Sequence, residues 1–143
     1  MKSLILGRAR DVIGALLLAS LMGACAHRSV STTKGALSFG ADVTKIRIEM
    51  SNGTLDLAAV EAGASQSEIT WQGGIRRDAG SAEDLTKIEV VSTELAGSMD
   101  PGEPGTFVVT CPKAPSGVVG MIAYEGNLRV PAKLPLEVVV TDN

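Results

Sequence analysis

The chain is poor in the residues that build most catalytic and metal sites. Its 143 residues include one histidine, two cysteines and only 3% aromatic residues. A single histidine argues against a Ser-His-Asp site or a histidine-built metal site. Two cysteines are too few for a disulfide-dense scaffold or a four-cysteine zinc site. An excess of basic residues is also lacking, because the net charge is -3, and this argues against a broad nucleic-acid surface. The length predicts a single domain.

An apolar run follows a basic N-terminus. Lys2, Arg8 and Arg10 precede the run from Val12 to Ala24, whose only polar member is Ser20. As a helix this run covers about 20 Å, whereas the hydrocarbon core of a bilayer is roughly 30 Å thick. The run is too short to span a membrane comfortably, so it predicts the core of a signal peptide.

The end of this run resembles the lipobox of bacterial lipoproteins. It reads Leu21-Met22-Gly23-Ala24-Cys25, with small residues directly before the cysteine. The departure is Met22, where leucine is commonest in that family. The resemblance implies cleavage between Ala24 and Cys25, lipidation of Cys25 and acylation of the new N-terminus. Two alternatives stay open, an ordinary cleaved secretory signal and an uncleaved anchor.

A lipidated Cys25 would set both the location and the domain plan. Two or more acyl chains give stable membrane anchoring, which one chain does not. The expected location is the bacterial cell envelope, and Ala26, standing where aspartate marks inner-membrane retention in enteric bacteria, favours the outer membrane. We expect a signal peptide at 1–24, a lipidated cysteine with a flexible tether at 25–41, and a β domain at 42–143. Without residues 1–24, which carry three basic residues and one acidic residue, the net charge changes from -3 to -5.

The segment predicted as a tether is polar, rich in small residues and without a period. Its His27 lies next to the anchor, where we expect contact with lipid headgroups or solvent rather than a ligand role.

From Asp42 onward the pattern is typical of short strands. Ile46, Ile48 and Met50 alternate with polar residues, which indicates a half-buried strand. The following Ser51-Asn52-Gly53 predicts a tight type I′ hairpin turn, and a second strand then covers 54–60. The other expected strands are 68–73, 86–95, 106–111, 118–124, 127–131 (a separate piece or a continuation of the one before) and 134–141.

Three segments between these strands are expected to be irregular or helical. Ser81 predicts an N-cap for one helical turn, residues 76–80 read as a solvated loop, and residues 96–105 as a turn-rich connection. Seven or eight short strands with frequent turns predict an all-β fold, either an antiparallel sandwich or an open β-solenoid.

Two stretches, 46–57 and 128–138, resemble an adhesin-like domain family of bacterial envelope proteins. The first holds a strand, Asn52-Gly53 and a strand; the second holds Val130-Pro131, a short spacer and an apolar strand. The resemblance implies a displayed, non-enzymatic β domain with an unknown protein or glycan partner. In that family further β rungs follow the second stretch, so either 42–143 is a shortened version or a fragment, or the resemblance is partial. If the terminus is native, the strand edge at Val138 to Thr141 is a candidate site for self-association or for a partner.

The remaining candidates for chemistry are few. Cys111 is expected to be a buried small hydrophobe, with an intermolecular disulfide as the alternative. Trp71 and Tyr124 are expected in the core or at its rim. Two acidic groups, Glu83-Asp84 and Asp100 with Glu103, are expected to be solvated, with a cation site as the alternative. Arg76-Arg77 could contact phosphate, but a solvated loop is the simpler interpretation.

We therefore assign no catalytic residue, no metal ligand and no cofactor. The first hypothesis is a lipid-anchored, non-enzymatic envelope protein that contacts a partner or has a structural role. The second is a periplasmic small-ligand-binding protein or enzyme on a β scaffold, which a pocket with convergent polar groups would favour.

Overall fold

The computed structural model describes residues 27–60 and 65–141, which form eight strands and one helix. In chain order these are β1 (His27–Ser38), β2 (Lys45–Met50), β3 (Gly53–Val60), β4 (Glu68–Ala79), α2 (Ala82–Glu89), β5 (Ala96–Met99), β6 (Thr106–Thr110), β7 (Gly120–Pro131) and β8 (Leu136–Val140). No helix within these residues has the length and apolar character needed to cross a membrane.

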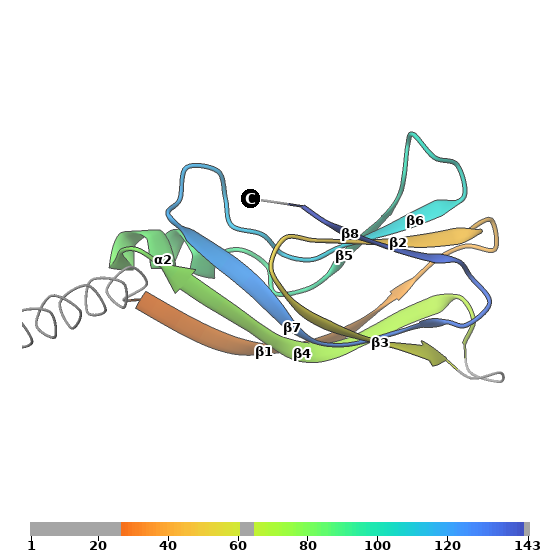
Figure 1. Ribbon diagram of the computed structural model, residues 1–143, viewed down its shortest axis with the longest axis horizontal. Coiled ribbons are helices and arrows are strands. Elements are labelled where there is room, and N and C mark those ends of the chain that lie inside the picture. The colour runs from red at the N-terminus through yellow and green to blue at the C-terminus, as the bar shows by residue number, and fades with distance from the viewer. Residues whose placement is uncertain (1–26, 61–64, 142–143) are drawn as a thin grey trace, which may run out of the picture.

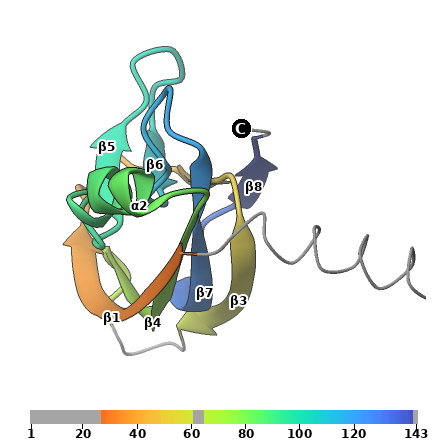
Figure 2. The ribbon, with the colours of Figure 1, turned by 90° about the vertical axis from the view of Figure 1, so that its left-hand side faces the viewer.

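The strands form two four-stranded sheets that face each other as an all-β sandwich, as predicted (Figure 1). One sheet, here called sheet A, has the order β1-β4-β7-β3, and the other, sheet B, has the order β5-β6-β2-β8. The sheets are mixed rather than purely antiparallel, because β3 runs parallel to β7 and β2 runs parallel to both β6 and β8. The helix α2 covers one end of the sandwich, beside the start of β1 (Figure 2).

The core lies between the sheets and follows from strand alternation. Ile46 and Ile48 of sheet B are fully buried, as are Ile75, Tyr124 and Leu128 of sheet A. Burying one such side chain contributes about 1.5–3 kcal/mol, so this shared layer supplies the main stabilisation of the fold. Trp71 is 6% exposed, and its indole Nε1 donates a hydrogen bond to Thr33 Oγ1 at 3.2 Å. Trp71 and Tyr124 thus belong to the core, as expected.

The predicted hairpin at Asn52-Gly53 is wrong, although both of its strands exist. The strand β2 lies in sheet B and β3 in sheet A, so the turn carries the chain from one sheet to the other. A type I′ turn needs positive φ at two residues, and only Gly53 has it, with φ +122°. A Cβ on Gly53 would lie 1.8 Å from the carbonyl oxygen of Tyr124. The glycine therefore serves the close pairing of β3 with β7 rather than a hairpin.

The predicted flexible tether is also wrong from His27 onward. Residues 27–38 form β1, which pairs antiparallel with β4 along its whole length, from His27 opposite Ala79 to Ser38 opposite Glu68. The inward positions hold Thr33, Gly35 and Leu37, and Gly35 lies directly against the Trp71 ring. Thr33 and Gly35 leave room for the Trp71 ring of β4, while Leu37 packs against the core as an apolar side chain of β1 itself. The domain accordingly includes β1 as well as the residues from Asp42 onward.

Three further expectations are corrected between residues 73 and 99. The strand β4 continues through Gly73-Gly74 and the predicted loop at 76–80 as far as Ala79. Residues 86–89, expected in a strand, complete α2, while the expected connection at 96–105 begins with the strand β5. The predicted N-cap is confirmed, since Ser81 Oγ accepts a hydrogen bond from the Asp84 amide at 3.1 Å. The pieces expected at 118–124 and 127–131 form one continuous strand, β7.

Candidate functional site

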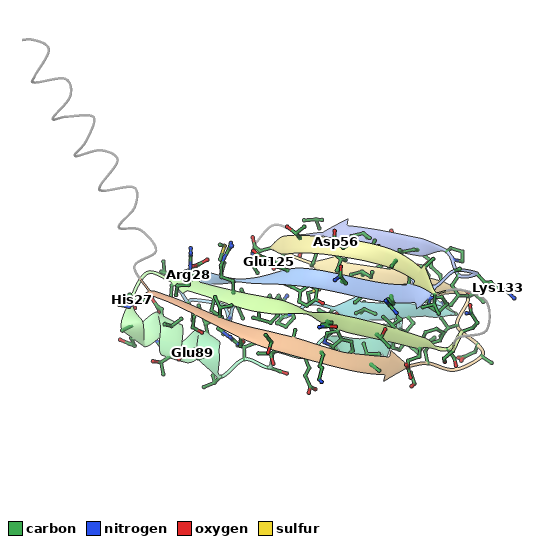
Figure 3. All side chains as sticks on the ribbon, turned by 90° about the horizontal axis from the view of Figure 1, so that it is seen from below. His27, Arg28, Asp56, Glu89, Glu125 and Lys133 are labelled. Carbon is green, nitrogen blue, oxygen red and sulfur yellow. The ribbon has the colours of Figure 1, made fainter. Side chains whose placement is uncertain are left out.

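The predicted cleavage and lipidation residues, Ala24 and Cys25, lie outside the described residues. The first described residue, His27, already belongs to β1. Two residues of chain reach at most about 7 Å, so Cys25 can lie no farther than this from the start of the sandwich. Figure 3 shows His27 beside α2, with Lys133 at the opposite end of the domain. Any group attached to Cys25 is therefore held at the α2 end.

Asp100 and Glu103, expected to be solvated and with a cation site as the alternative, are engaged by basic side chains. Arg47, on the outer face of sheet B, contacts Asp100 at 2.5 Å, Glu137 at 3.0 Å and also Glu103. Lys45 contacts Glu103 at 3.0 Å and Glu137 at 2.7 Å. The hydrogen bond from Lys45 is the main reason that the pKa of Glu137 lies below its ordinary value, and the hydrogen bond from Arg47 is the next largest contribution. This arrangement is an ion-pair network that joins β2 to β8 and to the loop after β5.

The other acidic pair, Glu83-Asp84, lies in the first turn of α2. Lys87 contacts Glu83 at 2.8 Å across one turn of the helix. Across residues 27–60 and 65–141, no three His, Cys, Asp or Glu side chains stand close enough to hold a metal ion.

Arg76 and Arg77 lie on opposite faces of β4. Arg76 faces outward and contacts Asp78 at 2.9 Å and Glu125 at 2.8 Å. Arg28 of β1 contacts the same buried Asp78 at 2.5 Å. Arg77 faces inward, is 4% exposed, and donates to Ser31 Oγ at 2.8 Å. The two guanidinium groups do not converge, so they form no joint phosphate site.

Cys111 is buried at the end of β6, in agreement with the first expectation. Its side chain is 4% exposed, and burial raises the pKa of the thiol to about 11. The nucleophilic thiolate is therefore scarce at neutral pH. Burial also raises the pKa of Tyr124, to about 12. Neither side chain is set up as a nucleophile or an acid–base group near pH 7.

A hollow of about 850 Å³ lies over the outer face of sheet A. Strand register brings its polar groups together, because Gln72 on β4 is opposite Lys34 on β1 and Asn127 on β7, and Thr70 is opposite Arg129. A second hollow, of about 870 Å³, shares Lys34, Gln72 and Asn127 with it. Both are open troughs on the surface rather than cavities between the sheets. The first hollow offers amide and hydroxyl groups with the cations of Lys34 and Arg129, which suits hydrogen bonding to a hydroxylated or anionic ligand. The second is also lined by the carboxylates of Glu94 and Glu125, which suit an anion less well.

The sandwich closes on one side and stays open on the other. At the β1/β5 side, the rings of Phe39 and Phe107 pack at a tilt of 40° with their centroids 5.4 Å apart. At the opposite side, where β3 and β8 form the edges (Figure 2), apolar side chains remain exposed. The exposed fractions are 41% for Leu57 of β3, and 37%, 42% and 66% for Leu136, Val138 and Val140 of β8. We call these four residues the open edge.

The open edge is made of residues that alternation points toward the core. Leu136, Val138 and Val140 are opposite the buried Ile46, Ile48 and Met50 of β2, so they lie on the inner face of sheet B. They stay exposed because β8 is the last strand of its sheet and β3 covers them only in part. The sequence placed a strand edge at Val138 to Thr141, and β8 does lie at the edge of its sheet. Leu57 and Leu136 were not singled out, although their alternation was visible in the sequence.

In the comparisons with known proteins, no family model, no curated protein and no solved structure matches this chain.

Proposed function

We propose that this chain is a lipid-anchored protein of the bacterial envelope that contacts a partner through its β-sandwich and carries out no catalysis. The observation that carries the proposal is the apolar run closed by Leu21-Met22-Gly23-Ala24-Cys25, directly before the first strand. Such a run fits export, and the cysteine fits attachment of acyl chains. The resemblance to adhesin-like envelope domains supports a role in display.

The short connection between Cys25 and β1 sharpens this proposal. With Ala26 as the only residue between the cysteine and His27, the sandwich would stay in contact with the membrane surface and not extend from it on a tether. Its α2 end would lie closest to the lipid headgroups. The outer membrane is the favoured location because alanine, not aspartate, follows the cysteine.

The test is mass spectrometry of the mature N-terminal peptide combined with membrane fractionation. The full chain should give an acylated peptide that begins at Cys25 and should fractionate with membranes. The Cys25→Ser variant should lose the acyl mass and accumulate as precursor, whereas the matched Cys111→Ser variant should behave as the parent chain. An unmodified Cys25 in a soluble fraction would contradict the anchor, and an intact residue 1 would indicate an uncleaved segment.

A second candidate function, small-ligand binding, is favoured by the first hollow over the outer face of sheet A. Its amides and cations come from three neighbouring strands and point to the same side. A glycan with acidic groups would satisfy Lys34 and Arg129 together. Binding of an acidic oligosaccharide, lost in Gln72→Ala and retained in a substitution on sheet B such as Ser98→Ala, would support this candidate over partner contact through the edge.

A further inference from the structure

The free side of β8 carries unpaired backbone groups at every second residue. Ile46 donates its amide to the carbonyl of Pro135, at 3.0 Å, and Thr141 donates to the carbonyl of Met50, at 2.9 Å. In a parallel ladder both backbone groups of one residue point to the same side, and the side alternates along the strand. The amides and carbonyls of Leu136, Val138 and Val140 therefore point away from β2. Within the described residues no strand pairs with this side.

This edge is complementary to itself. If a second β8 approaches antiparallel with Val138 opposite its own copy, Leu136 lies opposite Val140 of the second chain, and Val140 opposite Leu136. All three outward-pointing residues then form hydrogen-bonded pairs. In the same register Glu137 lies opposite Val139, so the two glutamates do not face each other. A two-fold axis relates the two chains, which is the commonest symmetry of protein dimers.

The edge also lacks the features that usually prevent such pairing. Natural edge strands are protected by lysine, proline, bulges or inward-pointing charges. From Leu136 to Val140 the strand contains none of these, and its one charge, Glu137, is held back toward β2 by Lys45 and Arg47. The exposed apolar side chains of the open edge would meet those of the second copy and become covered.

We propose that the open edge binds a second copy of this chain, β8 against β8 and antiparallel about Val138, so that the two B sheets form one continuous sheet. The occupant is a second copy because the apolar pattern, the position of the charge and the free backbone groups all match under one two-fold axis. The pairing does not depend on acylation of Cys25, so either proposal can fail without the other.

Cross-linking of the full chain in membranes tests the register. In a Cys111→Ser background, Val138→Cys places two thiols opposite each other, with Cα atoms about 5.5 Å apart, which is within disulfide range. Oxidation, or a short bis-maleimide, should convert most Val138→Cys chains to a covalent dimer. The Cys111→Ser chain without Val138→Cys should give no covalent dimer. A dimer in this control would show that Cys25 carries a free thiol. Two matched controls, Val139→Cys on the outer face of β8 and Val30→Cys on the exposed edge strand β1, should cross-link at least five-fold less.

A second measurement separates pairing from folding. By light scattering in detergent, the full chain should have the mass of two copies, and Val138→Lys should have the mass of one with an unchanged circular dichroism spectrum. Val119→Lys, at an exposed valine away from the edge, should remain a dimer. A wild-type monomer at high concentration, equal cross-linking at Val30→Cys, or a Val138→Cys adduct with a different protein would each overturn the proposal.

Discussion

Replacing Gly35 with alanine tests whether β1 packs as part of the domain. A Cβ at Gly35 would lie 2.3 Å from Cζ2 and 2.6 Å from Cη2 of Trp71. The ring is 6% exposed and is held by its hydrogen bond to Thr33, so it has little room to withdraw. Overpacking of this kind costs about 1–3 kcal/mol, and the lower entropy of the unfolded alanine chain offsets about 0.4–1 kcal/mol. We expect a net loss of about 1–2 kcal/mol in the free energy of unfolding.

The assay is thermal unfolding of the full chain in detergent. For a domain of this size the expected loss lowers the Tm by about 4–8 °C. Trp71 is the only tryptophan in the chain, so its fluorescence spectrum should change in the same variant. The matched control is Gly74→Ala on β4, where a Cβ would meet nothing closer than 3.8 Å and the Tm should stay within about 2 °C of the parent value.

A double-mutant cycle identifies the contact. In a Trp71→Leu background the ring is absent, so Gly35→Ala should cost at least about 1 kcal/mol less than in the parent chain. An unchanged Tm and an unchanged fluorescence spectrum in Gly35→Ala would refute the packing of β1 and restore the interpretation of residues 27–38 as a tether.

Three further predictions concern the buried or paired polar groups. Asp78→Ala should lower the free energy of unfolding by about 1–2 kcal/mol, because it removes a buried carboxylate that accepts hydrogen bonds from both Arg76 and Arg28; a urea titration that shows no loss would contradict this. The pKa of Glu137 is lowered in the folded state, so its stabilising contribution is present above about pH 4.3 and disappears as the pH falls through the folded pKa. Arg47→Met should therefore reduce the loss of stability between pH 5 and pH 3, measured by urea midpoints, and an identical pH profile would contradict the network. Since burial raises the pKa of Cys111 to about 11, a thiol reagent at pH 8 should label it only after unfolding, and rapid labelling of the native chain, read by peptide mass, would show that the thiol is accessible.

The sequence was most informative where one face of a strand is buried. The alternation of Ile46, Ile48 and Met50 fixed both the strand and its inner face, and Ser81 fixed the start of α2. The sandwich class followed from the number and spacing of such strands. The sequence did not reveal which strands pair with each other. The strand β3 pairs with β7, which is distant along the chain, and no local pattern encodes that pairing. Asn52-Gly53 has the composition of a hairpin turn, yet tertiary pairing decides its conformation.

Polar strands were the main source of error. Apart from Leu37, the inward residues of β1 are mostly small or hydroxyl-bearing, and most of its outward residues are polar, so its pattern resembles a linker. The outward charges of Arg76 and Asp78 suggested a loop, but cross-strand ion pairs with Glu125 and Arg28 let them lie within the sheet. In α2, the β-branched Thr86 and Ile88 suggested a strand, whereas burial of Ile88 and the pairing of Lys87 with Glu83 support the helix. In the two strands the deciding interactions join positions that are distant along the chain.

The two proposals constrain each other if both hold. The α2 end of each copy would be held within about 7 Å of its anchor, while β8 runs from the Lys133 end toward the His27 end (Figure 3). Antiparallel pairing of two β8 strands then places the two anchored ends at opposite ends of the dimer. Both ends can reach one membrane only when the strands lie along its surface, whereas upright copies could pair only across two facing membranes. Cross-linking of Val138→Cys in dilute, single-layer vesicles that do not touch each other separates the two cases. Cross-linking within one vesicle requires the flat orientation. Cross-linking that appears only when vesicles aggregate requires the upright orientation.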